Sequence, residues 1–291
     1  MACPLQGLAC IVSRIRNGRL DDRFKPLLLS CWLVGVPKPD GGTRPIAVGE
    51  SLYKMAAFHA LKSVAGSIPP VLGTSQFAFL PGGSETAGLL LKALSEASLM
   101  FAVDLRNAFN SVDRAMMLEA LYAERDLSPL FRLVDFAYSA SSDLLLRDRD
   151  NLLCSVVQSR NGTRQGDPLG MLLFCLAIKA PIATALASTS VPIRVVAVAD
   201  DVTFVGPADG AAVATAVGVF RRECAARGLR FATKCKTVNF TAAPLDQSIV
   251  DLSRDVDAPI VTTAVKLLGN GPRPCRRASA GPGEHDGPQS L

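Results

Sequence analysis

The stretch RVVAVADDVTFVG, residues 194–206, carries two adjacent aspartates, Asp200 and Asp201, between two apolar runs. Runs of β-branched residues on both sides of a short polar pair predict a β-hairpin with the carboxylates at its turn. A second apolar run, LMFAVD at residues 99–104, predicts another strand that ends in a carboxylate, Asp104. The residue pattern therefore predicts an α+β fold with a central hairpin.

Three carboxylates at the ends of neighbouring strands indicate a metal site. Carboxylate oxygens suit Mg²⁺, and two such ions about 3.5–4 Å apart can stabilise the attacking and leaving oxygens of an in-line phosphoryl transfer. Alone, Asp104 is more often a turn or helix-capping residue, and an Asp pair is an ordinary hairpin end. Because the chain contains both the strand ending in Asp104 and the hairpin turn with Asp200 and Asp201, the metal site is favoured.

Composition sets broad limits on the class of protein. The 291 residues are 49% hydrophobic, which is ample for a core, and the formal charge of +5 only slightly favours a polyanionic partner. None of the eight cysteines forms a CxxC pair and only two histidines are present, so a zinc site is not expected. We interpret the cysteines as reduced, mostly buried thiols of an intracellular protein.

The most apolar window runs from Met171 to Val191 and is interrupted by Lys179 and Pro181. A charge and a helix-disrupting proline favour a buried core helix over a membrane span. The N-terminus lacks the order of a signal peptide. We therefore expect no membrane partner.

Other segments have recognisable patterns. Helices are predicted over residues 51–64, over 84–97 with Ser84 as N-cap, from about Ser111 to Tyr122, and over 211–228 with Gly228 ending the helix. Residues 141–160 alternate as a β-hairpin does, and 228–240 are interpreted as a strand or strand pair. Residues 1–35 suggest a helical extension, and 271–291 are rich in Pro, Gly, Ser and charge, which predicts a disordered tail.

Seven sequence blocks, taken in order, resemble the reverse transcriptase domain of non-LTR (LINE-type) retrotransposons. The blocks are PKPDGGTRPIAVGESLYKMAA (37–57), QFAFLPGGSETA (76–87), FAVDLRNAFNSVD (101–113), NGTRQGDPLGMLLF (161–174), AVADDVTF (197–204), GLRFATKCKTVNF (228–240) and VKLLGN (265–270). A single block would be weak evidence, but their shared order is specific. The resemblance implies a right-hand polymerase with fingers and an antiparallel palm sheet backed by helices over residues 36–270, with the thumb absent or truncated.

By this resemblance, Asp104 and Asp200 are metal ligands, Asp201 is a supporting ligand, and the cofactor is a pair of Mg²⁺ ions. Lys236 matches a lysine that acts on the pyrophosphate leaving group, although a surface lysine on a strand is the plain alternative. The carboxylates and Lys236 together form the predicted catalytic set.

The nucleotide-binding set is Lys38, Arg44, Phe109, Gln165 and Gly166. If Asp40 to Gly42 form a three-residue loop, Lys38 and Arg44 become cross-strand neighbours able to grip a triphosphate. The resemblance gives Phe109 the position that excludes a 2′-hydroxyl, which favours dNTPs, although a core Phe is equally plausible from the residue alone. Gly166 permits close backbone approach, and the Gln165 amide can bond nucleotide or template.

The implied activity is RNA-directed DNA polymerisation from a primer 3′-OH, with an RNA template, a DNA primer and dNTPs as partners. A group II intron-type reverse transcriptase or maturase is the alternative enzyme. A non-catalytic RNA-binding remnant is the alternative of another class, because Val198, Gly170 and Ala232 depart from the family's pattern. The resemblance also implies a nuclear location, whereas the oligomeric state is not indicated.

Overall fold

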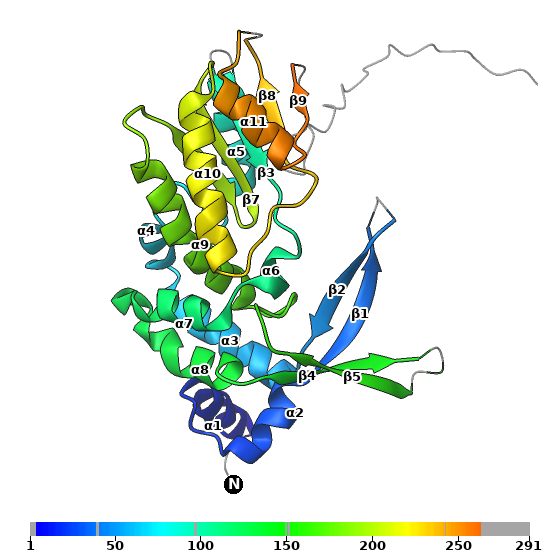
Figure 1. Cartoon of the computed structure of the whole chain (residues 1–291). Coiled ribbons are helices and arrows are strands. Elements are labelled where there is room, and N and C mark those ends of the chain that lie inside the picture. Colours follow the sequence, from blue (N-terminus) through cyan, green and yellow to red (C-terminus); the bar gives the residue numbers. More distant parts are fainter. Residues whose placement is uncertain are drawn as a thin grey trace, which may run out of the picture.

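The computed structural model describes residues 4–38, 41–95, 98–148, 150, 152–241 and 243–262. A central sheet flanked by helices occupies one end of the molecule, a second sheet projects to the side, and a group of helices lies at the other end (Figure 1). The predicted 271–291 tail and the VKLLGN block lie outside the described residues, as do Pro39 and Asp40.

The central sheet has five strands in the order β6-β7-β3-β8-β9. They are β3 (Ser98–Val103), β6 (Arg194–Val198), β7 (Asp201–Pro207), β8 (Lys236–Asn239) and β9 (Ile260–Val261). All neighbouring strands run antiparallel except β8 and β9. The predicted hairpin around Asp200 and the predicted strand before Asp104 are both confirmed, and β3 is the strand that β7 and β8 flank.

Helices surround this sheet and form the other end of the molecule. Their bounds are α1 (Pro4–Arg16), α2 (Lys25–Leu29), α3 (Ser51–Val64), α4 (Ile68–Leu72), α5 (Gly83–Leu94), α6 (Ala108–Ser111), α7 (Arg114–Tyr122), α8 (Phe131–Tyr138), α9 (Gly170–Ala187), α10 (Ala211–Ala226) and α11 (Gln247–Asp255). Two 3₁₀ turns, η1 (Asp22–Phe24) and η3 (Arg125–Leu130), precede α2 and α8.

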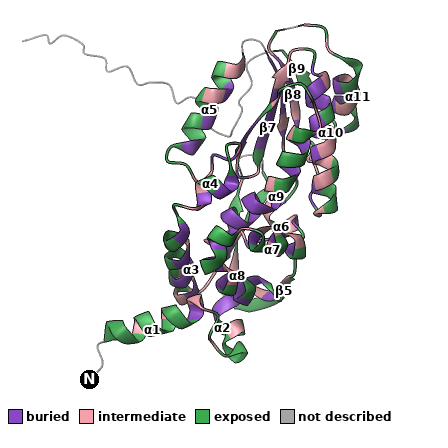
Figure 2. Ribbon diagram, turned by 90° about the vertical axis from the view of Figure 1, so that its left-hand side faces the viewer, coloured by how far each residue is buried: buried purple, intermediate pink, exposed green. Residues whose placement is uncertain are grey.

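Both faces of the central sheet are covered, because successive strand residues point to opposite sides. Met100 and Val205 lie in a cluster with Leu91 of α5. The adjacent residues Phe101 and Phe204 belong instead to the main core, which includes α9 and α10. Figure 2 shows α5 on one side of the sheet and α10 and α11 on the other.

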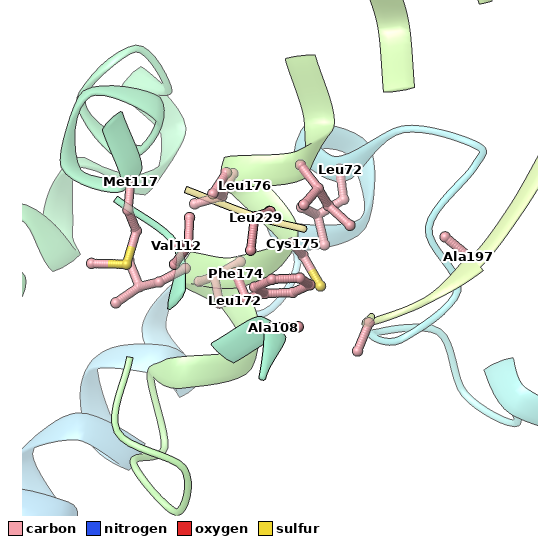
Figure 3. Close-up of a cluster of buried hydrophobic side chains, with 14 of the residues drawn as sticks. Leu72, Ala108, Val112, Met117, Leu172, Phe174, Cys175, Leu176, Ala197 and Leu229 are labelled. Carbon is pink, nitrogen blue, oxygen red and sulfur yellow. The ribbon is translucent and has the colours of Figure 1, made fainter. Parts of the chain in front are cut away.

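Helix α9 is the apolar segment predicted to be a core helix, and this prediction is confirmed. By length and composition the helix could cross a membrane, but 61% of it is buried inside the protein. Its side chains Leu172, Phe174 and Cys175 lie in the same cluster as Ala108 and Val112 (Figure 3). It thus connects the central sheet to the helices beneath it.

A side sheet projects from this helical part, with strand order β2-β1-β4-β5. It consists of β1 (Cys31–Pro37), β2 (Thr43–Val48), β4 (Ser142–Arg147) and β5 (Leu153–Ser159). β1–β2 and β4–β5 are antiparallel hairpins, and β1 and β4 pair in parallel at Cys31 and Trp32. The predicted hairpin over residues 141–160 is confirmed, and the side sheet joins two hairpins distant in sequence.

A buried ion pair ties the side sheet to α9. The Arg164 guanidinium and the Asp167 carboxylate are 2.8 Å apart, with both side chains 2% exposed. Arg164 Nη1 also donates to the carbonyl of Leu29, the last residue of α2, and to the hydroxyl of Ser142, the first residue of β4. The Tyr53 hydroxyl of α3 donates to Asp167 at 2.9 Å. The two side chains of the pair therefore link α2, β4 and α3.

Some predicted boundaries were wrong in detail. Gly82 at φ +63°, not Ser84, is the N-cap of α5, because the chain enters the helix in a left-handed conformation that favours glycine. The helix predicted from about Ser111 to Tyr122 begins later, at Arg114 of α7, since the Asp113 carboxylate accepts the Met116 N–H and caps the helix there; Ser111 instead ends the short α6. The predicted extension 1–35 contains α1 and α2, but β1 begins within it at Cys31.

Gly162 is the point where the loop before α9 touches the segment after β3. The Gly162 N–H donates to the carbonyl of Val112 at 2.8 Å, and the Thr163 N–H donates to that of Phe109 at 2.6 Å. Gly162 has φ +60°, and a Cβ there would collide with the Phe109 carbonyl and lie 2.6 Å from Asn110 Cα. Only glycine allows this approach.

We expect Gly162→Ala to destabilise the protein by about 2 kcal/mol or more, because it adds both backbone strain and a steric overlap. Gly88→Ala is the matched control: a Cβ on α5 there meets nothing within 4 Å, so stability should rise by about 0.5–1 kcal/mol. Urea unfolding of both variants measures the difference. Wild-type stability of Gly162→Ala would contradict the close approach.

Candidate active site

The three aspartates lie at one end of the central sheet. Val103 of β3 pairs with Val202 of β7 as the last pair of that ladder, so Asp104 and Asp201 are the next residues outward on adjacent strands. Val198 pairs with Asp201 across the hairpin, which leaves Ala199 and Asp200 as the two turn residues. The fold thus brings together carboxylates that are about a hundred positions apart in the sequence.

The carboxylates perturb one another. Desolvation by burial raises the pKa of Asp104 and of Asp200, and the nearby Asp104 charge raises the pKa of Asp200 further. Asp201 is more exposed, yet partial desolvation followed by repulsion from Asp200 and Asp104 raises its pKa to about 6. Electrostatic repulsion among like charges at this rim is the condition that a bound cation relieves.

Cations from two other segments face these carboxylates. The charges of Lys234 and Lys38 lower the pKa of Asp104, against the larger effect of its burial, and the charge of Arg44 does the same for Asp200. The β1–β2 hairpin thus presents its basic residues to the carboxylate end of the central sheet.

The predicted register of that hairpin was wrong. Arg44 pairs with Val36, and the Lys38 N–H donates to the carbonyl of Gly42, so Lys38 and Arg44 are diagonal neighbours and not direct partners. The turn is centred one residue earlier than predicted, because Gly41 takes the left-handed conformation at φ +82°. Residues 36 and 38 share a strand face, so both cations still lie on the same side.

Lys236, predicted to serve the leaving group, lies on β8 opposite Ala102. Of the two lysines in this segment, the one whose charge reaches Asp104 is Lys234, two residues earlier. Between them, the buried Cys235 accepts the Asp104 N–H at 3.3 Å and donates to its carbonyl at 3.6 Å. Sequence reasoning missed Lys234 and Cys235; the signal was the Lys-Cys-Lys triplet, in which only the last residue was assigned a role.

Phe109 is the second residue of the short helix α6, which follows Asp104 in the chain. Its ring is half-buried, and the ring centroid lies 4.7 Å from that of Phe174 on α9. Phe109 is therefore both a core contact and a partly exposed residue five positions after Asp104. The two interpretations offered by the sequence are compatible.

Gln165 and Gly166 are fixed against β2. The Ala47 N–H donates to the Gln165 carbonyl at 2.7 Å, and a Cβ on Gly166, whose φ is +110°, would lie 2.7 Å from the Ala47 carbonyl oxygen. The adjacent Arg164–Asp167 pair anchors this loop in the core. Next to Gln165, a cleft of about 360 Å³ opens between the side sheet and the loop, with Asn110 and Arg160 on its walls.

The donor set fits a divalent cation that prefers oxygen. Asp104, Asp200 and Asp201 offer only carboxylate oxygens, and their mutual repulsion favours a positive ion between them. Among the described residues, no three Asp, Glu, His or Cys side chains are already grouped closely enough to hold a metal. The rim therefore supplies the oxygen ligands without presenting them as a preformed cluster.

We expect Asp201→Asn to stabilise the metal-free protein at neutral pH. Because the folded pKa of about 6 exceeds the ordinary 3.8, the wild-type protein loses stability as pH rises through that interval, and the variant does not. Solvent screening keeps the effect small, so the expected rise in Tm is about 1–3 °C at pH 7.5, vanishing near pH 4. If the variant and the wild-type protein had the same Tm at pH 7.5 as well as near pH 4, the inferred repulsion among the carboxylates would be contradicted.

Comparisons with known proteins agree with this arrangement. The chain is 28% identical over 200 residues, which are 69% of its length, to the retrotransposable element SLACS 132 kDa protein of Trypanosoma brucei gambiense, and spans 17% of that protein. Two solved telomerases share the fold. The Candida tropicalis apo enzyme, truncated from its C-terminal domain, has a TM-score of 0.51 at 13% identity, covering 75% of this chain and 51% of its own. The Candida albicans enzyme, in complex with a fragment of telomeric RNA, has a TM-score of 0.54 at 12% identity, covering 82% and 46%.

The family comparison covers most of the chain. Residues 36–270 match the reverse transcriptase (RNA-dependent DNA polymerase) family. The central sheet with its helices is accordingly the palm, and the side sheet belongs to the fingers. The chain belongs to the reverse transcriptase family.

Proposed function

We propose that this chain extends a DNA primer 3′-OH with dNTPs on an RNA template. The observation that carries the proposal is the set of three carboxylates on two palm strands, faced by the basic residues of the fingers hairpin. This arrangement has what a phosphoryl transfer needs, namely oxygen ligands for divalent ions and cations for a triphosphate. An intracellular, nuclear setting is part of the proposal.

Asp104 and Asp200 hold the ions in this proposal, and Asp201 supports them. When bound, two Mg²⁺ ions supply Lewis-acid stabilisation of the attacking and leaving oxygens. The protein's own task is to keep the three carboxylates ionised at one rim in spite of their raised pKa values. Lys234 and Lys38 assist, because their charges favour the ionised form of Asp104.

Lys38 and Arg44 bind the triphosphate. They lie diagonally on one face of the hairpin, and their charges reach Asp104 and Asp200 respectively. A triphosphate placed between the hairpin and the palm would contact both cations at one end and the carboxylate rim at the other. Lys236 begins β8 and Lys234 precedes it, on the other side of β3 from the Asp200 hairpin, and we assign the leaving pyrophosphate to this pair.

The template is assigned to the side of Gln165 and Gly166. The cleft beside Gln165 presents amide and guanidinium groups from Asn110 and Arg160, which suit base edges and phosphates. Two observations support an RNA template: the match to the reverse transcriptase family, and the RNA bound in the Candida albicans telomerase structure. A maturase-type enzyme would show the same palm chemistry and differ in the RNA that it prefers.

The test of the proposal is primer extension by the purified chain on a short RNA template with dNTPs and Mg²⁺. Asp104→Asn and Asp200→Asn should each lower incorporation by about a thousandfold or more, because each removes a shared metal ligand. Circular dichroism should show the fold intact. A non-catalytic RNA-binding remnant would bind the template equally in all three proteins and extend none of them.

Phe109→Val should admit ribonucleotides, because it removes bulk beneath the 2′-carbon of the incoming sugar. We expect the ratio of rNTP to dNTP efficiency, measured as kcat/KM, to rise by about tenfold or more. Phe131→Val is the control, since that aromatic ring meets the Tyr122 ring edge to face, away from the palm carboxylates. An unchanged ratio would leave Phe109 as a core residue only.

A further inference from the structure

The palm turn that carries Asp200 has an unfavourable backbone. Ala199 adopts φ +55°, one of three non-glycine residues with positive φ in the described part of the chain. This left-handed conformation costs an L-residue about 1–2 kcal/mol. Ala199 is also buried, at 7% exposure, so water does not satisfy its peptide groups. The surrounding structure must therefore hold the turn in place.

The group that holds the turn is the Gln76 side chain, from a segment 123 residues earlier in the sequence. Its Oε1 accepts the Ala199 N–H at 2.8 Å, and its Nε2 donates to the Ala199 carbonyl at 3.4 Å. Gln76 is 5% exposed, and the same Oε1 also accepts the Ala78 N–H at 3.2 Å. One buried amide thus satisfies both polar groups of the strained residue.

The backbone around Gln76 fixes that amide relative to the palm sheet. The Phe77 N–H donates to the Ala197 carbonyl, and the Ala197 N–H donates to the Ser75 carbonyl, both at 2.8 Å. Gln76 therefore forms a parallel bridge with Ala197 along the outer edge of β6. The Gln76 backbone is aligned with Ala197, two residues before Ala199. Its side-chain amide can therefore reach the peptide groups of Ala199.

We propose that Gln76 is a positioning residue of the active site, which sets the conformation of the Ala199–Asp200 turn and so the placement of the Asp200 carboxylate. Gln76 contacts neither nucleotide nor metal in this proposal, and acts through the turn. The inference rests on the proposed metal-dependent activity. It adds a role for the QFAFLPGGSETA block, to which the sequence assigned none.

Gln76→Met tests the proposal, because methionine has nearly the same shape without the amide. The matched control is Asn239→Leu. Asn239 is also buried, donates to the Ala243 carbonyl at 2.9 Å and accepts the Thr241 N–H at 3.2 Å, but it lies on β8 opposite Leu99, at the far end of the sheet. Both variants remove a buried amide that bridges backbone groups, so both should lower Tm.

Only Gln76→Met should affect the site. We expect its kcat for dNTP incorporation to fall about tenfold or more, with KM for dNTP changed less than about threefold, while Asn239→Leu stays within about twofold of wild type. A second readout needs no activity: the rise in Tm on adding Mn²⁺ should be lost in Gln76→Met and kept in Asn239→Leu. Equal behaviour of the two variants would overturn the proposal.

The strain supplies a rescue experiment. Ala199→Gly removes the cost of positive φ, so the double variant Gln76→Met/Ala199→Gly should recover several-fold in kcat over Gln76→Met alone. No recovery would show that Gln76 does not act through the turn. If Gln76→Met fails to fold, Gln76→Asn, whose amide is one methylene too short to reach Ala199, is measured in its place.

These readouts separate the positioning role from the activity itself. A wild-type protein that does not extend primers but gains Tm with Mn²⁺ would refute the polymerase proposal, and the Gln76→Met comparison would still decide the positioning role. A wild-type protein with neither response would refute both.

Discussion

The architecture depends on one buried ion pair, that of Arg164 and Asp167. Burying two charges is costly unless further hydrogen bonds satisfy them, and here Tyr53, Ser142 and the Leu29 carbonyl do so. Each of these partners belongs to a different part of the chain. The pair therefore sets how the fingers sheet, α3 and the start of α9 meet, and the loop it anchors carries Gln165 and Gly166.

The ring of Tyr138 extends this network, because it contacts two arginine side chains. The Tyr138 ring lies beneath the Arg164 guanidinium, 4.8 Å from centroid to Cζ, and beneath that of Arg114 at 5.1 Å. Arg114 donates in turn to the carbonyls of Gly162 and Ala140, both at 3.0 Å. Arg164 Nε is the buried side-chain atom without a partner in the described structure. The network fixes the junction of fingers and palm, but it leaves this one buried N–H group without a hydrogen bond, which lowers the stability of the fold.

The active-site rim has the opposite character, because its charges destabilise the fold. Desolvation and repulsion raise the pKa values of Asp104, Asp200 and Asp201, and the basic residues facing them offset only part of this cost. The strained Ala199 adds to it. Such local conflicts are typical of functional sites, and the proposed divalent cations would offset the repulsion among these carboxylates.

Much of this protein was determined by local sequence. Apolar runs that end in Asp104 and in Asp200–Asp201 predict the palm strands, and the interrupted apolar window predicts α9, because these signals depend on neighbouring residues in the chain. The order of the seven blocks along the chain predicts the family. Only the tertiary structure decided three other features. Lys38 and Arg44 lie diagonally on one hairpin face, and the charge of Lys234 acts on Asp104. The Gln76 amide forms hydrogen bonds with both peptide groups of Ala199. The physical reason is that hydrogen bonds and charges act between atoms that packing brings together across as many as 135 residues, as between Arg164 and Leu29, and no local pattern of residue types records which pairs will meet.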